Sequence, residues 1–146
     1  DSSTSRGLGD VYKRQTDLGS IFSKIIKNEI PCYKIAETEN CFAFLDVNPN
    51  SLGHTLCIPK VEEDYIFDLE SKLYSDLLNF SKVIAIAIKK AIPCERVAMS
   101  VIGLEVPHAH VHLIPINSMK DVDFKHKKKC SHENFEEIAE KIKNFL

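Results

Sequence analysis

Three histidines stand at alternate positions late in the chain: His108, His110 and His112. Side chains alternate between the two faces of a strand, so this spacing predicts that all three imidazoles project from one face. An imidazole is largely neutral at pH 7, and its free nitrogen can bind a metal ion or attack an electrophile such as phosphorus. Flanking imidazoles can then stabilise negative charge on phosphate oxygens and protonate a leaving group. The spacing alone leaves three interpretations open: a metal site, a nucleophilic site and a plain solvent-facing strand.

The elements that must position these histidines follow from the apolar pattern. Helices are predicted at 20–29, at 69–92 and after a capping serine, Ser131. Strands are predicted at 32–37, 41–46, 54–59, 96–102 and 108–115. One long helix among strands joined by hairpin-length connections indicates an α+β domain built on an antiparallel sheet.

Length and composition limit the classes of protein. A chain of 146 residues suits one domain, which we assign to residues 16–146. Residues 1–15 are rich in serine and glycine without an apolar period, and we interpret them as a cloning remnant or a disordered tail. A formal net charge of −2 argues against a nucleic-acid binder, since affinity for a phosphate backbone needs excess lysine and arginine.

Two further observations concern location. No apolar run approaches the ~18 residues of a membrane helix, and the N-terminus lacks the apolar core of a secretory signal. The five cysteines are odd in number, scattered and without a Cys-x-x-Cys pair, as is typical of a reducing compartment. We therefore predict a cytoplasmic protein without a membrane partner.

The histidine segment resembles the signature of the histidine-triad (HIT) nucleotide-binding family, in which three histidines alternate with apolar residues. Three earlier segments resemble that family in the same order: the opening helix and its exit at 20–31, and two nucleotide-binding strands at 42–49 and 53–60. The pattern is closest to the bacterial Hint-like branch. The resemblance implies a HIT-like fold, with a five-stranded antiparallel sheet, one long central helix, a short N-terminal helix and a C-terminal helix. It also implies a homodimer with a continuous ten-stranded sheet.

The same resemblance implies a reaction. His110 would attack the α-phosphorus of a purine nucleotide conjugate, and water would then resolve the nucleotidyl-histidine to release a nucleoside monophosphate. His112 would contact phosphate oxygens or the leaving group, and His108 would support the architecture of the site. The expected substrates are nucleoside 5'-phosphoramidates or related AMP conjugates, and no cofactor is expected.

The resemblance also assigns substrate-binding residues. Asp46 matches the acid that binds both ribose hydroxyls, and a carboxylate can indeed accept two hydrogen bonds from a cis-diol. The alternative is that Asp46 caps the turn before Asn48 and Pro49. Five apolar residues match positions that sandwich the base, although they could equally be plain core: Ile21, Phe22, Ile25, Phe44 and Val47.

Zinc is not expected. In zinc-bearing members, cysteines at the positions of Ser20 and Ser23 join two histidines equivalent to His54 and His108. Serine is a poor zinc ligand beside thiolate or imidazole. We therefore predict no metal site, with His54 as a hydrogen-bonded strand residue near the site, and we include it among the substrate-binding residues.

The loop before the triad departs from the family pattern. Better-known members carry a Gly-Gln pair and an upstream Asn that orient the phosphate, whereas here Leu104 follows Gly103 and residues 98–101 contain no Asn. Glu105 would bring a negative charge near a phosphate, so either it points away or the substrate differs. Two alternatives therefore stay open: a dinucleoside polyphosphate hydrolase, and a nucleotide-binding interaction module with weak catalysis.

Overall fold

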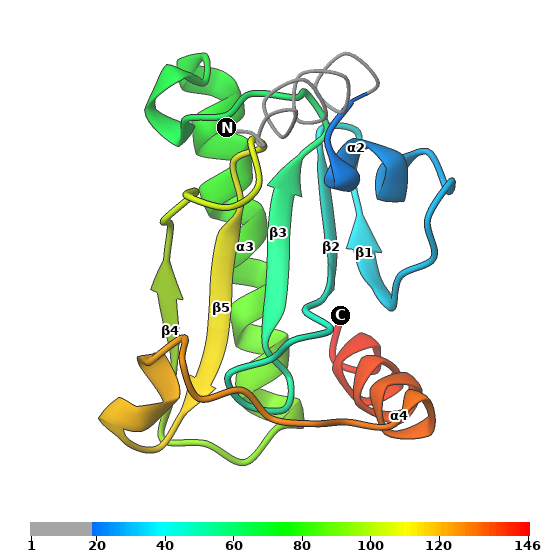
Figure 1. Cartoon of the computed structure of the whole chain (residues 1–146), viewed down its shortest axis with the longest axis vertical. Coiled ribbons are helices and arrows are strands. Elements are labelled where there is room, and N and C mark those ends of the chain that lie inside the picture. The colour runs from blue at the N-terminus through cyan, green and yellow to red at the C-terminus, as the bar shows by residue number, and fades with distance from the viewer. Residues whose placement is uncertain (1–18) are drawn as a thin grey trace, which may run out of the picture.

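A computed structural model describes residues 19–146, so the predicted tail at 1–15 lies outside the described residues. The helices are α2 (Ile21–Ile26), α3 (Ser71–Ala91) and α4 (His132–Lys143), with short 3-10 turns η1 (Ile66–Asp68) and η2 (Met119–Val122). The strands are β1 (Lys34–Glu37), β2 (Cys41–Leu45), β3 (Thr55–Pro59), β4 (Arg96–Ser100) and β5 (Val111–Ile116). The predicted α+β class and the order of helices and strands are confirmed (Figure 1).

The five strands form one antiparallel sheet in the order β1-β2-β3-β5-β4. The long helix α3 follows β3 and crosses one face of the sheet before β4 begins at the far edge (Figure 1). The chain then returns as β5 between β3 and β4, where His112 pairs with Leu56 and Ser100. This return places the end of the histidine segment beside the middle of the sheet.

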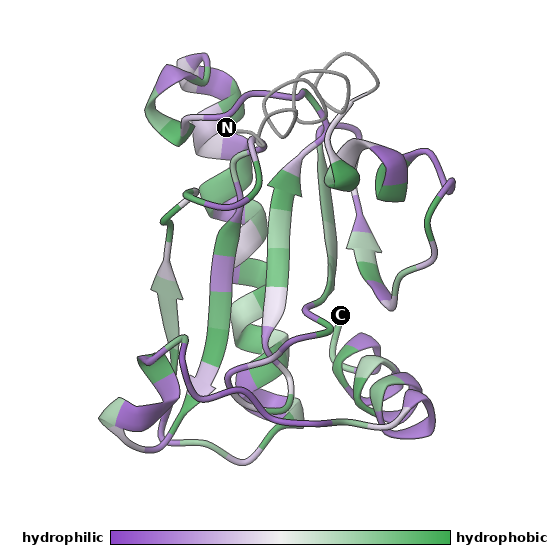
Figure 2. Ribbon diagram, viewed as in Figure 1, coloured by the Kyte–Doolittle hydropathy of each residue, from purple (hydrophilic) through white to green (hydrophobic). Residues whose placement is uncertain are grey.

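The alternation of side chains divides the core into two layers. Ala43, Leu45 and Cys57 point to the face covered by α3 and α4, where they join the main core. On the opposite face of the sheet, Phe42, Phe44, Leu56 and Ile58 pack against α2 and form a smaller cluster. Strands β2 and β3 are consequently buried on both sides, and Figure 2 shows them mainly green.

Two of the helix starts are confirmed by their caps. The Oγ of Ser20 accepts a hydrogen bond from the Ser23 N–H, and the Oγ of Ser131 accepts one from the Asn134 N–H. The predicted extent of α2 was too long, because Asn28 adopts a φ of 65° and ends the helix after Ile26. Within residues 19–146, none of the helices combines the length and apolar character needed to cross a bilayer. All five cysteines are free thiols.

Candidate active site

The histidine segment is only partly a strand. Regular pairing of β5 with β3 begins at Val111, so the predicted strand start at His108 was wrong. The reason is that the preceding backbone turns away from the ladder: the His108 N–H donates to Val106 O at 2.8 Å and the Ala109 N–H to Glu63 O at 2.6 Å. The three imidazoles therefore do not lie in one equivalent row.

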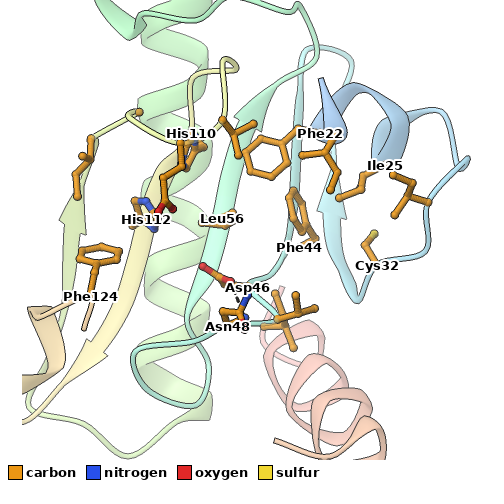
Figure 3. Close-up of a pocket in the computed structure, with 18 of the residues that line it drawn as sticks. Phe22, Ile25, Cys32, Phe44, Asp46, Asn48, Leu56, His110, His112 and Phe124 are labelled. Carbon is orange, nitrogen blue, oxygen red and sulfur yellow. Dashed lines mark hydrogen bonds between the residues drawn. The ribbon is translucent and has the colours of Figure 1, made fainter. Parts of the chain in front are cut away.

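His110 leaves one nitrogen free at a pocket. Its Nδ1 lies 2.8 Å from the carbonyl oxygen of His108, which can only accept, so Nδ1 carries the proton. In the neutral imidazole, the lone pair then belongs to Nε2. The ring packs edge-to-face against Phe22, with centroids 5.0 Å apart, and the residue lines the pocket (Figure 3). A neutral imidazole held in this tautomer is suited to nucleophilic attack.

His112 is oriented by a chain of hydrogen bonds that begins on the backbone. The Asn50 N–H donates to Nδ1 of His54 at 3.0 Å, so the proton of His54 is on Nε2. That Nε2–H donates in turn to Nδ1 of His112, also at 3.0 Å. His112 therefore carries its own proton on Nε2. Because His112 lines the pocket, its Nε2–H can donate a hydrogen bond to a ligand bound there.

Burial keeps the imidazoles of His54 and His112 neutral. Loss of hydration, with smaller effects from the nearby His112 and Lys127, lowers the pKa of His54 to about 3. Burial, with the neighbouring His110 and Lys127, lowers the pKa of His112 to about 4. Both imidazoles consequently donate as neutral groups at pH 7.

His108 belongs to a separate, closed cluster. Its Nε2–H donates to Pro59 O at 2.8 Å, and its Nδ1 accepts from the Ser20 hydroxyl at 2.7 Å. The backbone N–H of Ser20 and the hydroxyl of Ser23 both donate to Oε1 of Glu62 at 2.6 Å. Burial lowers the pKa of His108, so the imidazole stays neutral.

This cluster contains three of the four positions that the resemblance associates with zinc. Ser20, Ser23 and His108 lie together as the resemblance implied, but His54 bonds to His112 instead of joining them. Glu62 occupies the remaining place beside the two serines. Glu62 was missed because an exposed Glu-Glu-Asp run carries no signal that one carboxylate accepts hydrogen bonds from the two serines.

Asp46, His54 and His112 form the one candidate metal-binding group among the described residues, with ligand atoms within 4.8 Å of one another. The hydrogen bonds do not fit a metal there. Nδ1 of His54 already accepts from Asn50 and its Nε2 carries the proton, so neither nitrogen offers a lone pair. We therefore keep the prediction that the protein uses no metal.

Asp46 lies at the end of β2, at the edge of the pocket. Its Oδ1 accepts from the Asn48 N–H at 2.8 Å, so the carboxylate does stabilise the turn (Figure 3). Its Oδ2 lies 3.6 Å from Nε2 of His54. Burial raises the pKa of Asp46, while the Asn48 N–H and the positive charge of Lys127 act in the opposite direction. The turn uses only one of the two oxygens, which leaves the other available for a ligand.

All five residues assigned to the base line the pocket. The cavity has a volume of about 660 Å³, which is in the range of small-molecule sites. Phe22 and Phe44 meet edge-to-face with centroids 5.5 Å apart, while Ile21 and Val47 are largely exposed at the rim. Pro31 and Cys32 also line the pocket but were not predicted, because neither residue type signals a binding surface. His54 is fully buried behind His112 and is not among the lining residues.

Glu105 is an exposed residue that lines the pocket. Its negative charge contributes to raising the pKa of Asp46, after burial. The loop turns at Gly103, whose φ is +74°, and the side chain of Leu104 is 88% exposed.

A second group of lining residues comes from the segment after η2. Phe124 packs edge-to-face on His112 with centroids 4.9 Å apart, and the Lys127 Nζ lies 4.8 Å from the centre of the Phe124 ring. Lys127 stands in a lysine-rich run at 125–129, which has the composition of an ordinary solvated loop. Sequence patterning could not reveal its position, because only the path of the chain after β5 brings this segment back to the pocket.

Comparison with known proteins places these features in context. The profile of the HIT domain matches residues 27–119. The chain is 38% identical over 102 residues to adenosine 5'-monophosphoramidase HNT1 of Saccharomyces cerevisiae, covering 68% of this chain and 63% of that protein. It is 33% identical over 119 residues to adenylylsulfatase HINT3 of Arabidopsis thaliana, covering 78% of this chain and 60% of that protein. The chain thus spans less than two thirds of each of these relatives.

A solved structure matches over more of its length. The Hit-like protein of Bartonella henselae superimposes with a TM-score of 0.76 at 30% identity, covering 87% of this chain and 96% of that one. The predicted fold, with its five-stranded sheet, long central helix, short N-terminal helix and C-terminal helix, is confirmed by this match.

Proposed function

This chain belongs to the HIT family, and we propose that it is a nucleotide hydrolase that cleaves AMP conjugates through a nucleotidyl-histidine intermediate. The observation that carries the proposal is the tautomer of His110, which leaves Nε2 unprotonated at the pocket. Relatives named as a monophosphoramidase and an adenylylsulfatase both act on AMP linked to a leaving group. Nucleoside 5'-phosphoramidates are the first substrates to test.

The geometry supports a two-step route. Nε2 of His110 attacks the α-phosphorus, and the bond from phosphorus to the leaving group breaks with its electron pair going to the leaving atom. The neutral His112 donates its Nε2–H as a hydrogen bond to a phosphate oxygen or to that leaving atom, and a leaving amine takes its proton from solvent. Water then attacks phosphorus and loses a proton to solvent, the phosphorus–nitrogen bond to His110 breaks, and AMP is released with His110 restored.

The remaining pocket residues bind the nucleoside in this proposal. Phe22, Phe44 and their aliphatic neighbours contact a purine base, for which aromatic and aliphatic surfaces are suitable partners. Asp46 accepts hydrogen bonds from the ribose hydroxyls. The backbone carbonyl of His108 orients the ring of His110, and the side chain of His108 does not contact the substrate.

Trapping the intermediate tests this function. The protein is mixed with adenosine 5'-phosphoramidate, quenched in milliseconds with base, which preserves phosphohistidine bonds, and analysed by peptide mass spectrometry. We expect one adenylyl group on His110, and none in His110→Ala. Binding of AMP without any turnover or adduct, over a panel of amine, sulfate and polyphosphate conjugates, would instead support the nucleotide-binding module.

We also propose that the protein is a homodimer through β4. This strand forms one edge of the sheet, and the apolar residues Met99, Val101 and Ile102 on and after it are exposed. The Ser100 hydroxyl is buried without a hydrogen-bond partner among the described residues. A two-fold pairing of β4 edges would cover these groups. Light scattering at micromolar concentration tests it, and a monomer would contradict it.

A further inference from the structure

Lys127 is the one lysine or arginine among the described residues that line the pocket. It comes from the segment after residue 119, beyond the part of the chain that matches the HIT profile. Its Nζ donates to Oδ1 of Asn50 at 2.8 Å and lies over the Phe124 ring. A neutral amide and an aromatic face thus fix the direction of this side chain.

Among the described residues, the positive charge of Lys127 forms no ion pair with a carboxylate, although it acts on the pKa of Asp46 from a greater distance. Within residues 19–146, the ion pairs involve other lysines and histidines, and Lys127 makes none. An ammonium group offers three donors, and Asn50 uses one of them. The remaining donors are therefore available to a bound anion.

Lys127 lies at the end of the pocket where His112 is found. Asn50 connects it to His54 and so to His112, and Phe124 contacts both His112 and Lys127. The aromatic pair Phe22 and Phe44 occupies the opposite, apolar end. A nucleotide with its base at the apolar end and its phosphorus at His110 would direct its leaving group past His112.

We propose that Lys127 selects for AMP conjugates whose leaving group is an anion, such as sulfate, phosphate or a phosphate ester, over those that release a neutral amine. This proposal rests on the hydrolase function proposed above. When the His110 Nε2–P bond forms, the P–O bond breaks and its electron pair stays on the leaving oxygen. The Lys127 ammonium stabilises that added negative charge, which a neutral amine leaving group does not develop. Asp46 and Glu105, the two carboxylates lining the pocket, cannot provide this stabilisation.

The test compares two substrates that differ in the leaving group. For adenosine 5'-phosphosulfate and adenosine 5'-phosphoramidate, kcat/KM is measured with the wild type, Lys127→Met, Lys127→Arg and the control Lys125→Met. Lys125 is exposed, as Lys127 is, but it does not line the pocket. In Lys127→Met, we expect the ratio of sulfate to amide kcat/KM to fall about tenfold or more. Lys127→Arg and Lys125→Met should keep the wild-type ratio. An unchanged ratio in Lys127→Met would overturn the proposal.

A binding measurement separates this proposal from the proposed function. In a His110→Ala background, calorimetry gives the Kd of adenosine 5'-phosphosulfate with and without Lys127→Met. We expect Kd to rise about tenfold, with a smaller change for the phosphoramidate. Equal changes for both ligands would overturn the role of Lys127. Absence of turnover in the wild type, with the Kd difference intact, would contradict only the hydrolase.

Discussion

His108 and His110 are two residues apart, yet the ring nitrogens of their imidazoles are hydrogen-bonded differently. Both nitrogens of His108 are engaged inside the protein, by the Ser20 hydroxyl and the Pro59 carbonyl. His110 uses one nitrogen on a backbone carbonyl and leaves the other at the pocket. The same residue type has both nitrogens hydrogen-bonded within the protein in one cluster and keeps one nitrogen available to a ligand in the other. The unused nitrogen, more than the residue type, indicates where chemistry can occur.

The largest expected effect comes from replacing His110, the histidine with a nitrogen free at the pocket. His110→Ala should lower kcat for any hydrolysed conjugate by about a thousandfold or more while the Kd for AMP changes little, because the nucleophile is lost. Ser20→Ala in the closed cluster should leave kcat close to that of the wild type. It should instead lower the free energy of unfolding by about 1–2 kcal/mol, through the lost helix cap and the lost hydrogen bond to His108. A catalytic defect in Ser20→Ala as large as that of His110→Ala would show that the two clusters act as one.

The second effect concerns the chain that fixes His112. His54→Leu removes the donor to Nδ1 of His112 and should lower kcat by about 10- to 100-fold, with a smaller change in KM, because His112 no longer holds its proton at Nε2. His54→Gln can supply an amide N–H at this place and should recover part of the loss. If both variants lose kcat equally while remaining folded, His54 does not position His112.

The third effect is a pH dependence of stability. The pKa of His54 is about 3 in the folded protein and 6.5 ordinarily, so the unfolded chain binds an extra proton below pH 6.5. Stability is therefore complete above pH 6.5 and is lost as the pH falls. Between pH 6.5 and 5, His54 alone should cost about 2 kcal/mol. Urea unfolding at several pH values should give a shallower decline for His54→Gln, and parallel curves would contradict this origin.

Much of the fold could be predicted because local patterns and tertiary structure agree. The apolar spacing in 69–92 matches α3 to within two residues at either end, and the Ser131 cap marks the start of α4. The start of β5 was misjudged because alternation continues through His108 and His110, although their backbone is held by Val106 and Glu63. Strand periodicity cannot show where pairing begins.

Residues of the candidate site that belong to a sequence motif could be predicted. Residues that only the folding of the chain brings to the site could not. The triad and Asp46 stand in recognisable segments, but Asn50 acts through a backbone N–H that any residue type could supply. Glu62 and Lys127 come from charged runs that look like ordinary solvated surface. Both residues remain exposed, and their roles depend on which member of each run comes within hydrogen-bond distance of a partner far away in the sequence.

The smallest expected effect concerns Asp46, whose two oxygens divide between scaffold and pocket. Oδ1 accepts a hydrogen bond from the Asn48 N–H, so Asp46 has a role in the turn. The open question is whether the carboxylate also binds the ribose hydroxyls. Asp46→Asn keeps the shape but weakens hydrogen bonds to the hydroxyls, since charge-assisted bonds contribute about 1.5–3 kcal/mol each and neutral ones less. We expect the preference for AMP over dAMP conjugates, measured as a ratio of kcat/KM, to shrink about three- to tenfold. A role confined to the turn predicts a lower melting temperature in the variant with that ratio unchanged. Measuring both quantities on the same preparations decides between the two, because the turn and the ribose use different atoms of one side chain.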